Sequence, residues 1–263
     1  MELLLIEVAD RIATLTLNRP RSRNALNLAL MHALWDAVAG AGANPDVDVV
    51  IITGAGPAFC AGVDLKEAGG EVPPSAAPRA PGEGPERGAN GLFRFIPVID
   101  KPVLAAINGV CVTGGLELAL QCHLIIASDQ ARFADTHARV GVMPGGGMTV
   151  LLARAIGERA ALEWSLTGNF AEAAEAHRLG LVNHVVPHDE LLARARALAA
   201  DIAGNDQVAV RRLVQHYRAL AAAGSLDEAH AIEGVMAETW AAGTRHVAER
   251  RAAVSARGRD QIT

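Results

Sequence analysis

Apolar segments alternate with glycine-containing turns and helical segments along this chain. Residues 47–53 are almost entirely apolar and end at Gly54, and residues 103–107 end at Asn108 and Gly109. Apolar segments without polar alternation are typical of strands that are buried on both faces of a sheet. Because such strands alternate here with helical segments, the sequence predicts an α/β fold.

The other expected elements flank these strands. Residues 3–8 and 12–17 are predicted to be two short strands that form an opening hairpin, and a helix is expected over 28–41. Further helices are expected from about Asp64, over 92–99, 116–122 and 148–156, and through most of the chain after residue 158, with strands over 123–127, 132–134 and 181–186.

Residues 69–91 form a clear break in composition. They contain five of the twelve prolines together with several glycines, and no packed element is expected on such a segment. The segment is either a linker between two domains or a mobile flap over a site. Long loops inside compact domains are usually functional or disordered, which favours the flap.

Composition excludes several classes of protein. The chain has 263 residues, enough for one large domain or two small ones, and its net charge of −5 and its 3% of aromatic residues argue against a nucleic-acid-binding surface. Three cysteines, an odd number, indicate no disulfide framework and fit a reducing cytoplasm. The acidic N-terminus does not resemble a signal peptide, and no apolar run reaches the ~18 residues of a membrane span. No spacing of histidines and carboxylates indicates a metal site.

Two segments could present free backbone N–H groups at the start of a helix. Residues 58–66 lead into the helix expected at Asp64, and residues 108–115 end in Gly114 and Gly115 just before another. Such N–H groups suit an anion, so two of them directed at one carbonyl oxygen would stabilise a thioester enolate. The alternative is ordinary helix capping, with glycine present for tight packing.

Three polar residues are candidates for chemistry. Glu117 interrupts an apolar run at a helix start, where a carboxylate is costly unless it is paired or used; alternatively it only complements the helix dipole. His137 is a candidate acid or base, or a histidine held by ordinary contacts. Asp135 is a cap or turn residue, or it orients His137. If residues 133–137 are extended, the two side chains point to opposite sides, whereas a curled loop would bring them together.

A series of short motifs runs along nearly the whole chain. They are Leu17-Asn18-Arg19-Pro20, Asn24-Ala25-Leu26, residues 58–65, Lys101-Pro102-Val103, residues 106–109, residues 114–119, Phe133-Ala134, residues 144–147, residues 180–183 and residues 185–187. Each motif alone is weak. Taken together, in this order and at this spacing, they resemble the crotonase superfamily, the enoyl-CoA hydratases and isomerases.

The resemblance implies a fold, an assembly and a ligand. Such proteins fold as a spiral of strand–strand–helix turns, here residues 1–195. A helical region, here residues 196–263, would then form trimers or dimers of trimers. The ligand is an acyl-CoA thioester, so coenzyme A is part of the substrate and no separate cofactor is expected. Residues 69–91 correspond to a region that is mobile in many relatives.

The resemblance also implies roles for individual residues. The thioester oxygen would be held by the backbone N–H groups of Val63 and Gly114. Relatives that hydrate efficiently use two glutamates, of which the first corresponds to Glu117, while His137 stands at the position of the second. Contacts with coenzyme A and the substrate are expected from Arg21, Ala61, Asp64, Leu65, Lys66 and Gly115, with Arg21 or Lys66 near the phosphates.

Three functions remain open from the sequence. The leading interpretation is an enoyl-CoA hydratase that acts through Glu117 and His137. The second is an enoyl-CoA isomerase or another crotonase reaction, because moving a proton between two carbons needs only one base. The third is a non-catalytic acyl-CoA-binding protein that keeps the oxyanion pocket.

Overall fold

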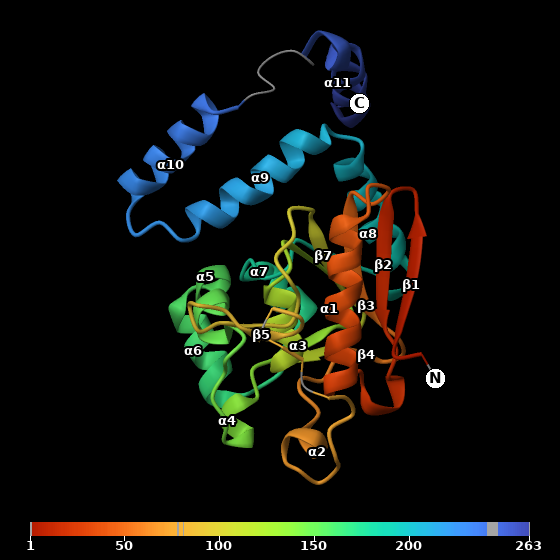
Figure 1. Cartoon of the computed structure of the whole chain (residues 1–263), viewed down its shortest axis with the longest axis vertical. Coiled ribbons are helices and arrows are strands. Elements are labelled where there is room, and N and C mark those ends of the chain that lie inside the picture. The colour runs from red at the N-terminus through yellow and green to blue at the C-terminus, as the bar shows by residue number, and fades with distance from the viewer. Residues whose placement is uncertain (1, 78, 81, 241–246, 263) are drawn as a thin grey trace. The chain divides into compact units, whose positions relative to one another are not determined.

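The computed structural model describes residues 2–77, 79–80, 82–240 and 247–262 (Figure 1). The chain divides into two compact units, residues 1–211 and 212–263. The helices of the first unit are α1 (Leu28–Ala43), α2 (Leu65–Ala68), α3 (Gly114–Leu120), α4 (His137–Val140), α5 (Ala153–Ile156), α6 (Glu158–Thr167), α7 (Ala173–Arg178) and α8 (Leu191–Ala203). Helix α9 (Gln207–Leu220) runs into the second unit, which also contains α10 (Leu226–Glu238) and α11 (Val247–Ile262).

The larger sheet of the first unit has six strands in the order β1-β2-β3-β7-β9-β12. They are β1 (Leu4–Ala9), β2 (Ile12–Leu17), β3 (Val49–Gly54), β7 (Val103–Ile107), β9 (Leu124–Ser128) and β12 (His184–Val186). Strands β1 and β2 pair antiparallel, and the other neighbours pair parallel. The predicted opening hairpin and the predicted apolar strands are therefore confirmed.

Both faces of this sheet are covered, which explains the unbroken apolar runs. Val50 and Ile52 of β3 pack in the main core with side chains of α1, whereas Val49 and Ile51 pack with side chains of α8. Because successive side chains of a strand point to opposite faces, a strand covered on both faces must be apolar throughout.

A smaller sheet supplies the second strand of each repeat. Its strands, in the order β11-β10-β8-β4, are β4 (Ala58–Cys60), β8 (Val110–Val112), β10 (Arg132–Ala134) and β11 (Ala171–Glu172). The chain passes from β3 to β4 and α2, from β7 to β8 and α3, and from β9 to β10 and α4. This repeated strand–strand–helix turn confirms the predicted spiral. Because β4, β8 and β10 are parallel neighbours, the starts of α2, α3 and α4 lie at one edge of the small sheet.

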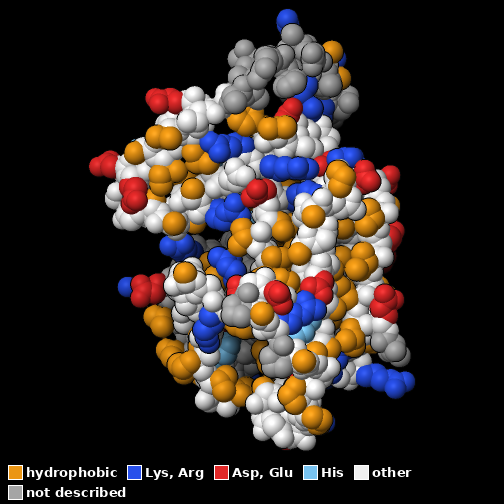
Figure 2. Space-filling model, in the orientation of Figure 1, with side chains coloured by type: hydrophobic (Ala, Val, Ile, Leu, Met, Phe, Trp, Pro, Cys, Tyr) orange, Lys and Arg blue, Asp and Glu red, His pale blue; other side chains and the backbone are white. Residues whose placement is uncertain are grey.

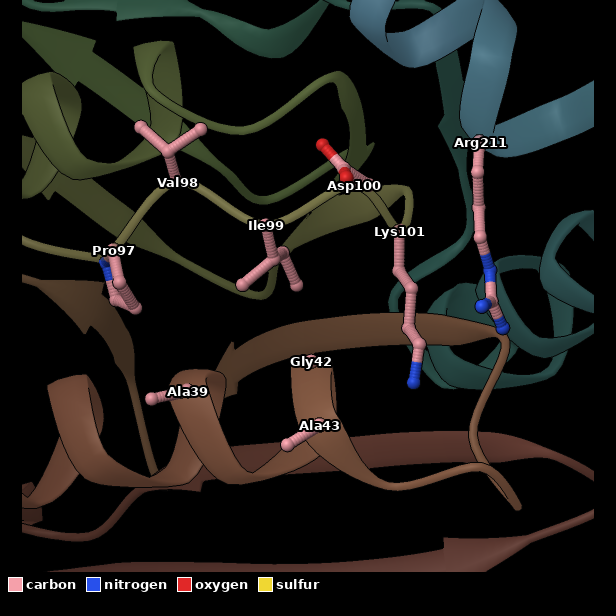
Figure 3. A pocket seen from close by; sticks show the side chains of 9 residues that line it. All are labelled: Ala39, Gly42, Ala43, Pro97, Val98, Ile99, Asp100, Lys101 and Arg211. Carbon is pink, nitrogen blue, oxygen red and sulfur yellow. The ribbon is translucent and has the colours of Figure 1, made fainter. Parts of the chain in front are cut away.

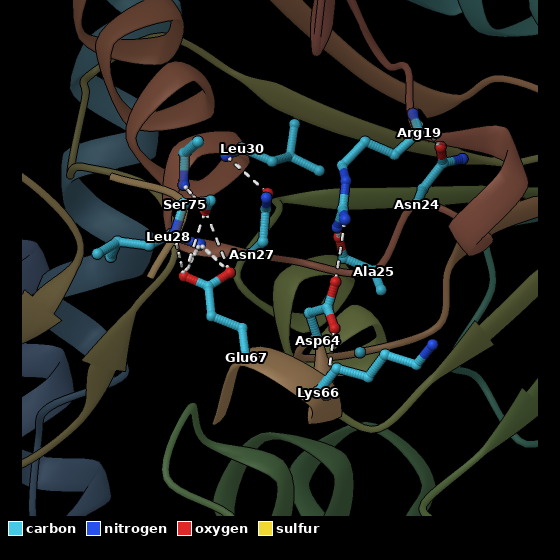
Figure 4. Close-up of polar contacts among 12 residues, drawn as sticks. Arg19, Asn24, Ala25, Asn27, Leu28, Leu30, Asp64, Lys66, Glu67 and Ser75 are labelled. Carbon is cyan, nitrogen blue, oxygen red and sulfur yellow. Dashed lines mark hydrogen bonds and ion pairs between the residues drawn. The ribbon is translucent and has the colours of Figure 1, made fainter. Parts of the chain in front are cut away.

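The proline- and glycine-rich segment is attached to the first turn of α1. The carboxylate of Glu67 accepts from Leu28 N (3.3 Å) and from Ser75 N (2.9 Å) (Figure 4). The hydroxyl of Ser75 in turn accepts from Ala29 N (3.0 Å). These contacts satisfy N–H groups that have no partner within the helix.

A second attachment lies further along the same segment, and the prediction that residues 69–91 form no packed element is wrong only at residues 86–87, which pair as a short strand. The Arg79 guanidinium donates to both carboxylate oxygens of Asp36 on α1 (2.5 and 2.7 Å), and β5 (Glu86–Arg87) pairs with β6 (Phe93–Arg94). Side-chain contacts with α1, which no local pattern of residues reveals, hold this segment.

The helix predicted over 92–99 is also wrong. Phe93 and Arg94 form strand β6, and the backbone here bonds to distant segments. Phe93 N donates to Gly145 O (2.8 Å), and Phe95 N donates to the side-chain oxygen of Gln121 (3.0 Å). The strand predicted over 181–186 is shorter than expected, because Leu181 N still bonds to the end of α7.

An open pocket of about 410 Å³ lies between the end of α1 and the segment before β7 (Figure 3). On its border the Lys101 ammonium donates to Ala41 O (2.8 Å) and Asn44 O (2.6 Å), and so caps the C-terminal end of α1. Burial, helped by the charge of Arg211, lowers the pKa of Lys101. The pocket lies beside the N-terminal end of β7. Helix α3 comes after the C-terminal end of β7 and after the strand that follows it, so the pocket is separate from the site described below.

The surface drawn in Figure 2 is mixed in character. Lys and Arg side chains are interspersed there with Asp and Glu and with apolar side chains. None of the helices in the described ranges is long and apolar enough to cross a lipid bilayer.

Candidate active site

Two free backbone N–H groups lie next to each other at the starts of α2 and α3. A Cβ atom built on Gly114 would lie 3.2 Å from the N atom of Val63, so the two residues touch. The neighbours of Val63 bond to Leu26, through Leu26 N to Gly62 O (2.8 Å) and Asp64 N to Leu26 O (3.0 Å). Among the described residues, neither the Val63 nor the Gly114 N–H has a backbone acceptor. The pair is therefore available to hold an oxyanion.

Backbone strain marks the residue before Gly114. Thr113 has φ 52° and ψ −120°, which is rare for a β-branched residue. Its N–H donates to Ala134 O (3.1 Å), and its hydroxyl lies 2.5 Å from that of Thr136. These bonds join the turn before α3 to the turn before α4. Strain of this kind persists where the surroundings hold it, commonly at functional sites.

Glu117 lies one helical turn beyond Gly114 and is only 3% exposed. Residues three apart share a helix face, and helical side chains lean toward the N-terminus, so this carboxylate is directed toward the turn at Gly114. Its Oε1 atom accepts from Gly146 N (2.7 Å) and Met148 N (3.3 Å). Its Oε2 atom lies 3.8 Å from His137 Nε2. The carboxylate is thus fixed by one oxygen and faces the histidine with the other.

His137 is the first residue of α4, and its imidazole is held by Asp135. The Nδ1 atom of His137 lies 2.6 Å from Asp135 Oδ1, and the same oxygen accepts from His137 N (3.1 Å). Both side chains are buried. Of the two conformations considered for this loop, the structure has the curled one, in which the aspartate orients the histidine.

The charge state of Asp135 determines which ring nitrogen of His137 carries a hydrogen. Burial alone would raise the pKa of Asp135, but hydrogen bonds from the His137 side chain, from Ser165 and from His137 N outweigh it, and the pKa is lowered. Asp135 is therefore a carboxylate near neutral pH and can only accept hydrogen bonds. The Nδ1 atom of His137 must then be the donor, which leaves Nε2, the ring nitrogen that faces Glu117, available to exchange protons.

The segment expected to contact coenzyme A is held by protein contacts on one side. Asp64 accepts from Lys66 N (3.2 Å) at the start of α2, and its carboxylate pairs with Arg19 Nη2 (3.0 Å) (Figure 4). Arg19 also donates to Ala25 O. This network orders the loop that carries Val63.

The other residues predicted to contact the ligand differ in exposure. Arg21, in a short 3₁₀ turn, is exposed, as are Leu65 and Lys66, and Ala61 is half-buried. Gly115 is buried, and a Cβ atom there would lie 2.3 Å from Cys60 O. Close packing of α3 on β4 is therefore enough to require this glycine, and its contact with a ligand stays a prediction.

Sequence reasoning missed several residues that hold Glu117 and Asp135 in place. Gly146 was noted only as part of the motif over residues 144–147, yet its N–H donates to Glu117, and a Cβ atom there would lie 2.9 Å from Glu117 Oε2 and 2.6 Å from Phe95 Cε2. The three consecutive glycines after Pro144 were the available signal. Ser165 on α6 gave none, because a single serine in a helix is unremarkable without the fold.

The site combines two free N–H groups with a buried carboxylate and a buried histidine at one edge of a spiral fold. This arrangement is suited to an enzyme that stabilises an anion formed next to a carbonyl group and moves protons beside it. In the part of the chain that the structure describes, no group of three or more His, Cys, Asp or Glu side chains is placed to hold a metal ion.

Comparison with known proteins identifies the family. The model of the enoyl-CoA hydratase/isomerase family matches residues 7–252, and the chain belongs to this family. A solved enoyl-CoA hydratase from Mycobacterium avium is 50% identical, with a TM-score of 0.72 over 89% of this chain and 96% of that one. A crotonyl-CoA hydratase from Syntrophomonas wolfei is 37% identical over 80% of this chain and 79% of its own length. A solved monofunctional enoyl-CoA isomerase from Mycobacterium smegmatis is 29% identical, with a TM-score of 0.72 over 88% and 99% of the two chains.

Proposed function

We propose that this chain is an enoyl-CoA hydratase that adds water to the double bond of a trans-2-enoyl-CoA. The observation that carries the proposal is the 3.8 Å separation of His137 Nε2 and Glu117 Oε2, in a site with two free N–H groups. Hydration needs a base for the water, an acid for C2 and stabilisation of the enolate oxygen, and this site has a group for each. Coenzyme A is part of the substrate, and no separate cofactor is required.

The reaction can be written with these residues alone. Glu117, as a carboxylate, takes a proton from water while the water oxygen bonds to C3. The electrons of the double bond form an enolate, whose oxygen accepts from Val63 N and Gly114 N. His137, as an imidazolium, then gives its Nε2 proton to C2, and the thioester carbonyl re-forms. Transfer of a proton from Glu117 to the nearby Nε2 restores both groups.

Asp135 would support this cycle without touching the substrate. Because its carboxylate accepts from Nδ1, the proton that moves is always the one on Nε2. The same carboxylate stabilises the imidazolium that donates to C2.

Each N–H of the oxyanion pair is expected to lower the barrier by about 3 kcal/mol.

Hydration of crotonyl-CoA by the wild type and by His137→Gln tests the proposal. We expect the wild type to be active and kcat of the variant to fall about 10²- to 10⁴-fold, the usual contribution of a general acid or base. His188→Gln is the matched control, since His188 bonds to Ser128 outside the site. A wild-type protein that hydrates no trans-2-enoyl-CoA of short, medium or long chain would contradict the proposal.

The similarity to a solved isomerase favours one second candidate. The same enolate forms when Glu117 or His137 removes a proton from the acyl chain and the pair returns it to another carbon. Such a reaction moves the double bond without adding water. A 3-enoyl-CoA substrate that is converted to its 2-enoyl isomer faster than crotonyl-CoA is hydrated would favour this candidate.

We also propose that the chain assembles as a trimer or a dimer of trimers through residues 196–263. The exposed apolar side chains of the second unit support this; they are Leu213, Tyr217, Leu226, Val235 and Val254. Light scattering of the purified protein should give three or six chains, and a monomer would contradict it.

Free cysteines support a reducing location such as the cytoplasm.

A further inference from the structure

The side chain of Gln121, the residue that directly follows α3, makes three hydrogen bonds to backbone groups of other segments. Its oxygen accepts from Phe95 N (3.0 Å), and its Nε2 atom donates to Phe93 O (2.8 Å) and Gly146 O (2.9 Å). The amide thus joins α3 to strand β6 and to the glycine loop after Pro144. A carboxylate or an apolar side chain of the same length could not supply this combination of donors and acceptor.

Gly146 is held at both of its backbone polar groups by the same helix. Its N–H donates to Glu117 Oε1 (2.7 Å), and its carbonyl accepts from Gln121 (2.9 Å). Glu117 and Gln121 are four residues apart, and Gln121 N donates to Glu117 O (3.1 Å), so both lie on one helical turn. A displacement of Gly146 would therefore remove a donor from Glu117.

Phe95 forms a wall against the same glycine. It is 2% exposed, and its ring packs edge-on against Phe93 with 5.0 Å between ring centres. A Cβ atom on Gly146 would lie 2.6 Å from its ring. Because Gln121 bonds to the backbone of both phenylalanines and of Gly146, it holds the two aromatic residues and the glycine loop in place together.

We propose that Gln121 is a positioning residue for Glu117. By holding Gly146, it keeps the N–H donor on Glu117 Oε1 and so keeps Oε2 directed at His137. The inference rests on the proposed hydratase function for its kinetic consequence, but the contacts themselves do not depend on it. The competing explanation is that Gln121 only stabilises the fold.

The test uses Gln121→Met, which keeps the length and removes all three hydrogen bonds, and Gln121→Glu, which keeps the acceptor for Phe95 N. Gln130→Met is the control, since Gln130 is exposed. For crotonyl-CoA we expect kcat of both Gln121 variants to fall about 10- to 100-fold with KM within about threefold, as for a misplaced catalytic group. Hydrogen exchange of the peptide over 144–148 should become faster in both variants, and that of the peptide over 92–96 should become faster in Gln121→Met, which also loses the acceptor for Phe95 N.

The outcomes separate the explanations. If the wild type is active and kcat of the Gln121 variants is within twofold of the wild-type value, the inference is overturned. It is also overturned if kcat falls and KM rises by the same factor. If instead the wild type is inactive on every enoyl-CoA, the proposed function fails, and unchanged hydrogen exchange over 144–148 would then overturn the positioning role separately.

Discussion

The Nδ1 atom of His137 lies 2.6 Å from Asp135 Oδ1, while the opposite ring nitrogen lies 3.8 Å from Glu117 Oε2. One imidazole therefore connects two buried carboxylates that have different tasks. Asp135 receives hydrogen bonds from the His137 side chain, from His137 N and from Ser165, whereas Glu117 is held by backbone N–H groups through Oε1. This arrangement places His137, which the resemblance puts at the position of a second glutamate, between the two carboxylates.

Asp135→Asn tests the orientation of the histidine. The amide removes the negative charge that stabilises the imidazolium, and an amide donor to Nδ1 places the hydrogen of the neutral ring on Nε2, so the imidazolium that gives its proton to C2 forms less readily. We expect kcat for crotonyl-CoA to fall about 10²- to 10⁴-fold, as in other sites where a buried aspartate sets the histidine tautomer. Ser165→Ala, which removes one donor to Asp135 and leaves the histidine contact, should lose less than about tenfold. Equal kcat in wild type and Asp135→Asn would contradict this role.

The lowered pKa of Asp135 also predicts how stability depends on pH. The ionised form is favoured in the folded state, so its contribution is complete above the ordinary aspartate pKa of about 3.8 and is lost as pH falls through the lower folded-state value. Urea unfolding of the wild type and of Asp135→Asn between pH 3 and 6 should show a stability difference that narrows below about pH 4. If the stability difference between the wild type and Asp135→Asn widens as the pH falls, this prediction is contradicted.

Gly146→Ala tests the close approach of the glycine loop to Glu117. The added methyl group would meet Phe95 at 2.6 Å and Glu117 Oε2 at 2.9 Å, so the loop must move away. We expect kcat to fall at least about tenfold and the melting temperature to drop. Gly40→Ala is the control, because a Cβ atom there meets nothing within 4 Å. This alanine in the interior of α1 should stabilise the protein by up to about 1 kcal/mol.

The cysteines should be unreactive in the folded protein. Burial raises the pKa of Cys60 and of Cys122 to about 12, and that of Cys111 well above its ordinary value. At pH 8 only about one Cys60 thiol in 10⁴ is then a thiolate, the form that reacts. A disulfide reagent should label three thiols in denaturant and label them far more slowly in the native state. Rapid labelling of any of the three in native protein would contradict this prediction.

The strands of the large sheet could be predicted because each is apolar throughout, as double-sided burial demands. The short strands of the small sheet were harder to predict from the sequence. Residues 58–60 and 110–112 have three residues each and take their place from pairing with one another, which leaves little periodicity in the sequence. Residues 92–99 were wrongly predicted to be helical because the bonds that hold Phe93 and Phe95 come from Gly145 and Gln121.

The residues proposed as acid and base could be named from motifs, but the contacts between them could not be predicted. Asp135 and His137 were compatible with either an extended or a curled loop, and the contacts of the observed curled loop with the turn before α3, such as the Thr136 hydroxyl beside that of Thr113, come from the fold. The donors to Glu117 come from Gly146 and Met148, about thirty residues further along the chain. Contacts of this range follow from the fold and not from the local sequence.

The most direct test of the account is mass spectrometry of crotonyl-CoA incubated with the pure protein in D₂O. We predict a product heavier by one D₂O, with one deuterium retained on carbon after transfer to H₂O. Glu117→Gln should still bind the thioester but form this product at least about 100-fold more slowly. If the wild type returns crotonyl-CoA and its medium- and long-chain trans-2-enoyl analogues unchanged, or with deuterium exchanged on carbon and no water added, hydration by the Glu117–His137 pair is contradicted.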